Sequence, residues 1–91
     1  MGVLAQNIID EKLAELEEWG SDGKSISKRF EFKNFAQSLE FVNKVGAIAE
    51  DSNHHPDIEF GWGYALITFT SHDAGGLTEK DFAAAERVEG I

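Results

Sequence analysis

The sequence predicts an α+β fold: a two-layer sandwich in which three helices pack on one face of a four-stranded antiparallel sheet. Two observations lead to this prediction. Apolar residues recur at helical spacing in three segments, and between these segments the apolar period changes to two. The predicted order is helix, two strands, helix, two strands, helix. A chain of 91 residues without a linker or repeat is predicted to form a single domain over residues 1–91.

The first third of the chain is predicted to hold a helix followed by two short strands. Leu4, Ile8, Ile9, Leu13 and Leu16 recur at helical spacing, with charged residues on the opposite side. Gly20 and the cluster at residues 21–23 are predicted to end this helix. Residues 25–27 form a weak strand candidate, whereas residues 29–33 alternate strictly between polar and aromatic side chains.

The middle of the chain carries the strongest helical pattern, with Asn34 as the predicted N-cap. Phe41 and Ile48 lie off the main apolar stripe, one heptad apart, and so form a second apolar face. This second face indicates either a partner subunit or crowding against the sheet. The main stripe comprises Phe35, Leu39, Val42, Val45 and Ala49.

The last third is predicted to form a hairpin and a final helix. Ile58 and Phe60 begin a strand, and Gly61-Trp62-Gly63 permits a tight reversal. Residues 64–71 are rich in aromatic and β-branched side chains, which is typical of a strand. Residues 78–81 have the capping-box pattern that opens a helix.

Composition and charge exclude several classes of function. The chain has no cysteine, which excludes disulfides, thiolate metal sites and a cysteine nucleophile. A formal net charge of −9 opposes direct binding to nucleic acid or to an anionic membrane. No apolar run approaches the ~18 residues of a membrane span, and the N-terminus lacks the pattern of a signal peptide. We therefore expect a cytoplasmic location.

All three histidines lie between residues 54 and 72, where a hairpin would return His72 toward His54 and His55. Glu50, four residues before His54, and Asp81 are carboxylates that could orient the rings. Imidazole exchanges protons near neutral pH, since its unperturbed pKa is about 6.5. The cluster is therefore typical of proton transfer in an elimination or isomerisation. Two alternatives remain: ordinary surface or capping histidines, and a zinc or iron site.

The spacing of these residues resembles that of the pterin-4a-carbinolamine dehydratases, also called 4a-hydroxytetrahydrobiopterin dehydratases. The family pattern is an acidic residue, His-His-Pro, an aromatic residue, a histidine and an aspartate at fixed intervals. In this chain it is met by Glu50, His54-His55-Pro56, Trp62, His72 and Asp81, with flanking matches at residues 30–35 and 76–81. The resemblance implies a lyase that dehydrates 4a-hydroxytetrahydrobiopterin to quinonoid dihydropterin and so recycles the cofactor of aromatic amino-acid hydroxylases.

The resemblance also implies roles for residues and partners. His54, His55 and His72 would be the catalytic acid and base groups, without a metal or organic cofactor. The substrate-binding residues would be Glu50, Asn53, Pro56, Ile58, Trp62, Ser71 and Asp81, among which Asn53, Ile58 and Ser71 depart from the commonest family residues. A homodimer or homotetramer is implied, with a hydroxylase in the same pathway. The alternative is a non-catalytic module that binds pterin or acts through oligomerisation.

Overall fold

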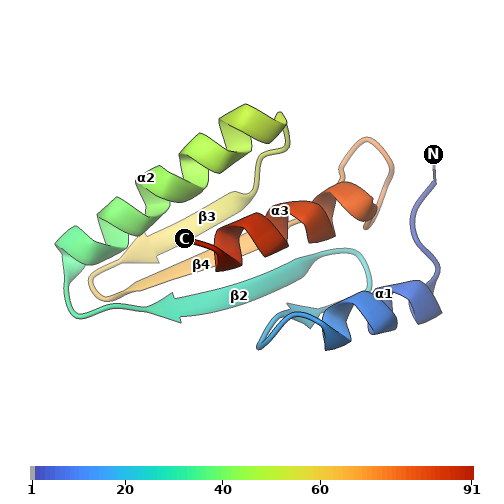
Figure 1. Ribbon diagram of the computed structural model, residues 1–91, viewed down its shortest axis with the longest axis horizontal. Coiled ribbons are helices and arrows are strands. Elements are labelled where there is room, and N and C mark those ends of the chain that lie inside the picture. The colour runs from blue at the N-terminus through green and yellow to red at the C-terminus, as the bar shows by residue number, and fades with distance from the viewer. Residues whose placement is uncertain (1) are drawn as a thin grey trace.

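A four-stranded antiparallel sheet in the order β1-β2-β4-β3 forms one layer of the protein, and helices form the other (Figure 1). The computed structural model describes residues 2–91. Its elements are α1 (Gln6–Ala14), β1 (Gly20–Ser21), β2 (Ile26–Glu31), α2 (Phe35–Ser52), β3 (Asp57–Gly61), β4 (Tyr64–Phe69) and α3 (Glu79–Glu89). The predicted α+β class and element order are confirmed.

The two strands expected before α2 are a single strand, and that part of the prediction is wrong. Residues 25–27 and 29–33 were expected to be separate, but β2 runs through Ile26–Glu31. The first strand is instead β1, at the position where only a helix stop was expected. The Asp22 carboxylate accepts hydrogen bonds from the backbone N–H groups of Lys24 and Ser25, at 2.9 and 2.8 Å, and so turns the chain back. A Gly-Ser strand has no hydrophobic pattern that could reveal it.

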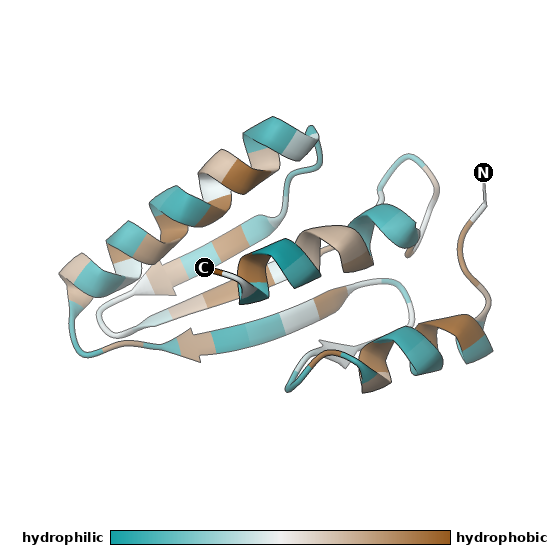
Figure 2. Ribbon diagram, viewed as in Figure 1, coloured by the Kyte–Doolittle hydropathy of each residue, from teal (hydrophilic) through white to brown (hydrophobic). Residues whose placement is uncertain are grey.

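The hydrophobic core lies between one face of the sheet and the helices. Ile26, Ile67 and Phe69 are each at most 1% exposed on this face. Ile58 pairs with Ile67 in register and is half-buried against the same core. Figure 2 shows hydrophobic and hydrophilic bands alternating along α2, and burial alternates from residue to residue along β4, as an element with one buried face requires.

The buried face of α2 includes Val45 and Ala49 of the predicted stripe but differs from it in the first half of the helix. Phe41 is buried, and its ring lies 4.6 Å from that of Phe30 and 5.0 Å from that of Phe32. Crowding against the sheet therefore accounts for Phe41, one of the two explanations left open. Phe35 and Leu39, expected in the main stripe, are 45% and 41% exposed. The residues of α2 that are buried are Ser38, Phe41, Val45 and Ala49.

Two aromatic residues, Phe30 at the end of β2 and Phe32 just after it, contact this face of α2. Their rings both lie against the ring of Phe41. An apolar pattern with two possible faces does not specify which one meets those rings. Within residues 2–91, no helix is both long and apolar enough to cross a bilayer.

Candidate functional site

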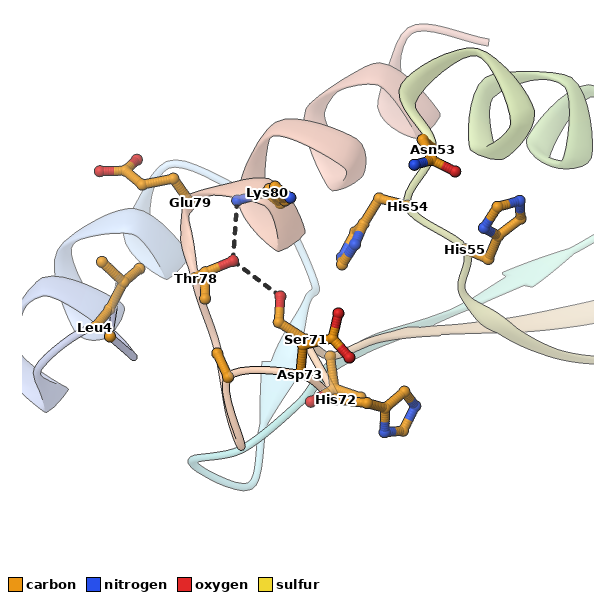
Figure 3. A pocket seen from close by; sticks show the side chains of 13 residues that line it. Leu4, Asn53, His54, His55, Ser71, His72, Asp73, Thr78, Glu79 and Lys80 are labelled. Atoms are coloured by element: carbon orange, nitrogen blue, oxygen red, sulfur yellow. Dashed lines mark hydrogen bonds between the residues drawn. The ribbon is translucent and has the colours of Figure 1, made fainter.

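A pocket of about 810 Å³ opens where α2 ends, where β4 ends and where α3 begins. His54 and His55 enter it from the segment after α2, and His72 enters from the loop after β4 (Figure 3). All three histidines therefore line one pocket. The complete lining is Gly2, Leu4, Asn53, His54, His55, Thr70, Ser71, His72, Asp73, Ala74, Thr78, Glu79 and Lys80.

The end of α2 determines where the two adjacent histidines lie. Asn53 adopts the left-handed conformation, with φ 53° and ψ 40°, which asparagine tolerates better than most residues. The backbone N–H groups of Asn53 and His54 both donate to the carbonyl of Ala49 and so complete the helix end. Pro56 follows, and the residue before a proline avoids the helical region. The chain therefore leaves the helix at the pocket rim.

His54 is the most firmly held of the three rings. Its Nε2 lies 2.6 Å from Oδ1 of Asp81, which is fully buried, and the His54 side chain is only 14% exposed. The imidazole also stacks on Phe69, with ring centroids 6.0 Å apart and planes 11° apart. An ionised carboxylate only accepts hydrogen bonds, so Nε2 carries the hydrogen. Nδ1 is then the nitrogen left to exchange a proton with an occupant of the pocket.

Asp81 is itself held by two donors on its other oxygen. Oδ2 accepts from the Ser71 hydroxyl at 2.8 Å and from the Thr78 backbone N–H at 2.9 Å. The second contact belongs to the capping box that opens α3, with Thr78 as the N-cap. A fully buried carboxylate with three hydrogen-bond donors has a fixed orientation.

His55 has a carboxylate partner of a different kind. Its Nε2 lies 2.6 Å from Oε2 of Glu50, but the two side chains are 52% and 80% exposed. Ion pairs as exposed as this contribute about 0–1 kcal/mol because water and salt screen them. The Glu50 carboxylate therefore orients the His55 ring only weakly, by comparison with the buried Asp81–His54 pair.

His72 lies on an exposed loop between β4 and α3. The loop is closed by hydrogen bonds from the Ser71 N–H to the Gly76 carbonyl and from the Gly75 N–H to the His72 carbonyl, at 3.1 and 3.2 Å. Gly75 has a φ of 81°, which favours glycine. Of the three imidazole rings, those of His54 and His55 have a side-chain hydrogen bond within residues 2–91, and that of His72 has none. His72 therefore differs from the other two histidines, each of which has a carboxylate partner.

The structure brings some of the expected substrate-binding residues to the pocket and leaves others outside it. Asn53 and Ser71 line the wall, and Asp81 lies behind it in contact with His54. Pro56 is half-buried but outside the lining, and Ile58 faces the core. Trp62 is 71% exposed in the turn between β3 and β4, at the end of the hairpin remote from the pocket (Figure 1).

Sequence reasoning missed several lining residues. Leu4 reaches the pocket because its backbone N–H donates to the Leu77 carbonyl at 2.8 Å. No pattern in the sequence predicts that contact between Leu4 and Leu77. Thr78 had a signal, the capping box, but this motif indicates a helix start and not a pocket wall. The other missed residues are Gly2, Thr70, Asp73, Ala74, Glu79 and Lys80.

The donor groups around the pocket suit proton transfer. Three imidazoles are present, one of them with a buried carboxylate partner. Within residues 2–91, no group of three or more histidine, cysteine, aspartate or glutamate side chains is arranged to hold a metal ion. The arrangement can take a proton at His54 Nδ1 and return one from a second imidazole across the opening.

Comparison with known proteins gives a consistent result. The family model for pterin 4 alpha carbinolamine dehydratase matches residues 3–91. A curated relative from Hahella chejuensis, named "Putative pterin-4-alpha-carbinolamine dehydratase", is 45% identical, with 91% of this chain and 78% of the relative covered.

Two solved structures resemble this one. The crystal structure of a transcriptional coactivator/pterin dehydratase from Brucella melitensis matches with a TM-score of 0.91 and 27% identity, covering 98% of this chain and 97% of that one. A pterin dehydratase-like protein identified as a RuBisCO assembly factor in the alpha-carboxysome matches with a TM-score of 0.65 and 30% identity, covering 79% of this chain and 83% of that one.

Proposed function

Because the chain belongs to the pterin 4 alpha carbinolamine dehydratase family, we propose that it is a lyase that removes water from 4a-hydroxytetrahydrobiopterin. The product would be quinonoid dihydropterin. The observation that carries the proposal is the contact between His54 and the buried Asp81 at the wall of a pocket shared by three imidazoles. Dehydration requires a group that takes a proton and another that gives one, and the pocket supplies both kinds.

The proposed reaction assigns His54 as the base. Its Nδ1 takes the proton from N5 of the pterin, the N5–C4a double bond forms, and the C4a–O bond breaks. A second imidazole, from His72 or His55, gives its proton to the departing hydroxide, which leaves as water. Asp81 stabilises the imidazolium that forms at His54, because the carboxylate lies 2.6 Å from the ring. The reaction is redox-neutral and releases no net proton: His54 passes its proton to solvent and the second imidazole takes one back, which restores both rings.

The biological setting belongs to the same proposal. We propose a cytoplasmic enzyme that recycles the pterin cofactor of an aromatic amino-acid hydroxylase. Phe35 and Leu39 of α2, which are 45% and 41% exposed, support the expected homodimer or homotetramer, since large apolar side chains at the surface mark interaction sites. Light scattering of the purified protein measures that assembly state.

Replacement of single histidines tests the proposed activity. The His54→Ala and His72→Ala variants should each lose about 10²–10⁴-fold in dehydration rate, the usual contribution of a positioned acid or base. The assay is stopped-flow absorbance on freshly generated 4a-hydroxytetrahydropterin, with chelator-treated protein alongside. Circular dichroism establishes that each variant is folded. Folded variants of both kinds with the full wild-type rate would refute the proposed activity.

A second candidate function is a non-catalytic module that binds pterin or acts through assembly. The resemblance to the RuBisCO assembly factor favours it, as does the exposure of His72, which no side-chain hydrogen bond holds within residues 2–91. Pterin binding measured by calorimetry, together with turnover no faster than the spontaneous reaction, would favour this module over the dehydratase.

A further inference from the structure

We propose that Ser71 and Thr78 are positioning residues whose hydroxyl groups fix Asp81, and through it the tautomer of His54. Hydrogen bonds converge on Asp81 from two sides: Ser71 donates to Oδ2, and the His54 ring donates to Oδ1. This arrangement leaves His54 with its hydrogen on Nε2 and its lone pair on Nδ1. The structural part of this proposal stands on the contacts alone, and only its kinetic consequence rests on the proposed dehydratase function.

The direction of each hydrogen bond follows from counting hydrogens. The Ser71 hydroxyl has one hydrogen, which it donates to Oδ2 of Asp81 at 2.8 Å. The Ser71 and Thr78 oxygens are also 2.8 Å apart, so Thr78 is the donor in that contact. Thr78 Oγ1 in turn accepts from the backbone N–H of Lys80 at 3.3 Å. The chain Lys80 to Thr78 to Ser71 to Asp81 is therefore fully directed.

Burial removes the Ser71 hydroxyl from the reach of a substrate. Ser71 is 8% exposed and Asp81 is 0% exposed, and the bond between them is buried. The only Ser71 hydroxyl hydrogen is engaged with Asp81, and its oxygen receives the Thr78 hydroxyl. Ser71 contributes to the pocket wall, but its polar group is directed to the carboxylate behind the wall. This differs from the substrate-binding role that the family resemblance implies for it.

The network joins three elements at one carboxylate. Ser71 follows β4, Thr78 and Asp81 open α3, and His54 follows α2. Oδ2 of Asp81 accepts from the Ser71 hydroxyl and the Thr78 backbone N–H, and Oδ1 accepts from Nε2 of His54. The capping box of α3 therefore does two things: it begins the helix and it aims a catalytic imidazole.

The Ser71→Ala variant tests the proposal against a matched control. Ser52→Ala removes a hydroxyl that bonds only to backbone carbonyls near the exposed end of α2. Ser71→Thr keeps the hydroxyl and serves as the rescue. The readout is the ¹⁵N NMR shift of each His54 ring nitrogen, assigned with His54→Gln, at about pH 9, well above the ordinary imidazole pKa of about 6.5. Steady-state kcat and KM are measured on the same samples.

The expected results separate positioning from substrate binding. Wild type, Ser52→Ala and Ser71→Thr should show one nitrogen protonated and one not. In Ser71→Ala the two shifts should move toward their average. The value of kcat should fall by roughly 10- to 100-fold with KM unchanged, because a misplaced catalytic group lowers the rate of the chemical step. A single unchanged tautomer in Ser71→Ala would overturn the proposal. A rise in KM without loss of kcat would also overturn it, because it indicates a substrate contact.

A second pair of variants guards against a folding defect. If Ser71→Ala does not fold, Thr78→Val and Thr78→Ser test whether the hydroxyl groups fix the His54 tautomer, at a residue one hydrogen bond further from the ring. Thr78→Val should give averaged His54 shifts and Thr78→Ser should restore the wild-type spectrum; unchanged shifts in a folded Thr78→Val would contradict the proposal. If the wild type shows no turnover, the proposed dehydratase function fails, whereas the NMR result still decides the tautomer.

Discussion

Replacing Asp81 by asparagine should reverse the tautomer of His54 while leaving the fold intact. The amide oxygen of asparagine can still accept from Thr78 N–H and Ser71 Oγ–H, as Oδ2 of the carboxylate does at 2.9 and 2.8 Å. The amide nitrogen then faces His54 and donates where Oδ1 accepted. To accept this hydrogen bond, Nε2 of His54 must be unprotonated, and the ring hydrogen therefore moves to Nδ1. The nitrogen left for the substrate then has no lone pair.

The expected loss in dehydration rate follows from the hydrogen bond that must break before His54 can act as a base. To act as a base, His54 has to return to the Nε2–H form and give up its bond with the amide. The Nε2–H form then faces the amide NH2, and leaving a buried donor unsatisfied costs about 1–3 kcal/mol, which at about 1.4 kcal/mol per factor of ten equals roughly 5- to 140-fold in rate. The imidazolium that forms also loses its carboxylate neighbour. We therefore expect a loss of about 10²-fold or more, with a ceiling near the 10⁴-fold of general base catalysis.

Stopped-flow dehydration with Asp81→Asn, wild type and Asp51→Asn measures this loss. Asp51 carries the same side chain on α2 but makes an exposed ion pair with Arg87, so its replacement should leave the rate unchanged. Far-UV circular dichroism and the thermal midpoint show that α3 still forms. A folded Asp81→Asn protein with a rate within threefold of wild type (about 0.65 kcal/mol at 1.36 per tenfold) would refute the argument from the tautomer.

Three further perturbations have expected outcomes. Glu50→Gln should lower the dehydration rate by less than about fivefold, since its contact with His55 is 80% exposed on the carboxylate side; a loss of 10²-fold would show that screening has been overestimated. Trp62→Ala should leave KM within about twofold, because Trp62 is 71% exposed and remote from the pocket, and a large rise in KM would contradict this placement. Backbone N–H groups of Lys24 and Ser25 lower the pKa of Asp22, so its ionised form stabilises the fold above the ordinary carboxyl pKa of about 3.9 and the effect is lost as pH falls through the lowered value. The difference in thermal midpoint between wild type and Asp22→Asn should therefore be largest near neutral pH and vanish in acid, and a difference independent of pH would contradict the cause given for the shift.

The fold class could be predicted because each long element has its own periodicity. The change of period after the His-His-Pro segment identified the hairpin, and the capping box identified the start of α3. The two-residue strand β1 was beyond such reasoning because Gly20 and Ser21 have no side chains that mark a buried face. The orientation of α2 was also beyond it, since Phe35 and Phe41 are equally apolar and the sequence does not show that Phe41 packs against the rings of Phe30 and Phe32.

The candidate site could be predicted in outline from residue types and spacing. The sequence placed three histidines and two carboxylates near one another, and the structure gives His54 and His55 the carboxylate partners Asp81 and Glu50. Sequence spacing could not reveal that one pair is buried and the other exposed, because burial depends on elements packed from elsewhere. For the same reason the wall residue Leu4 was missed: its position depends on a backbone contact with Leu77.

Phe69 has a consequence that extends beyond packing. Its ring is 1% exposed, stacks on that of His54 and lies 6.2 Å from the ring of Trp19. An exchange of this phenylalanine for a smaller residue would leave a void beneath the imidazole as well as within the interior. Efforts to make the protein more heat-resistant by redesigning its interior should therefore leave position 69 untouched, since a change there would also shift the His54 ring that stacks on it.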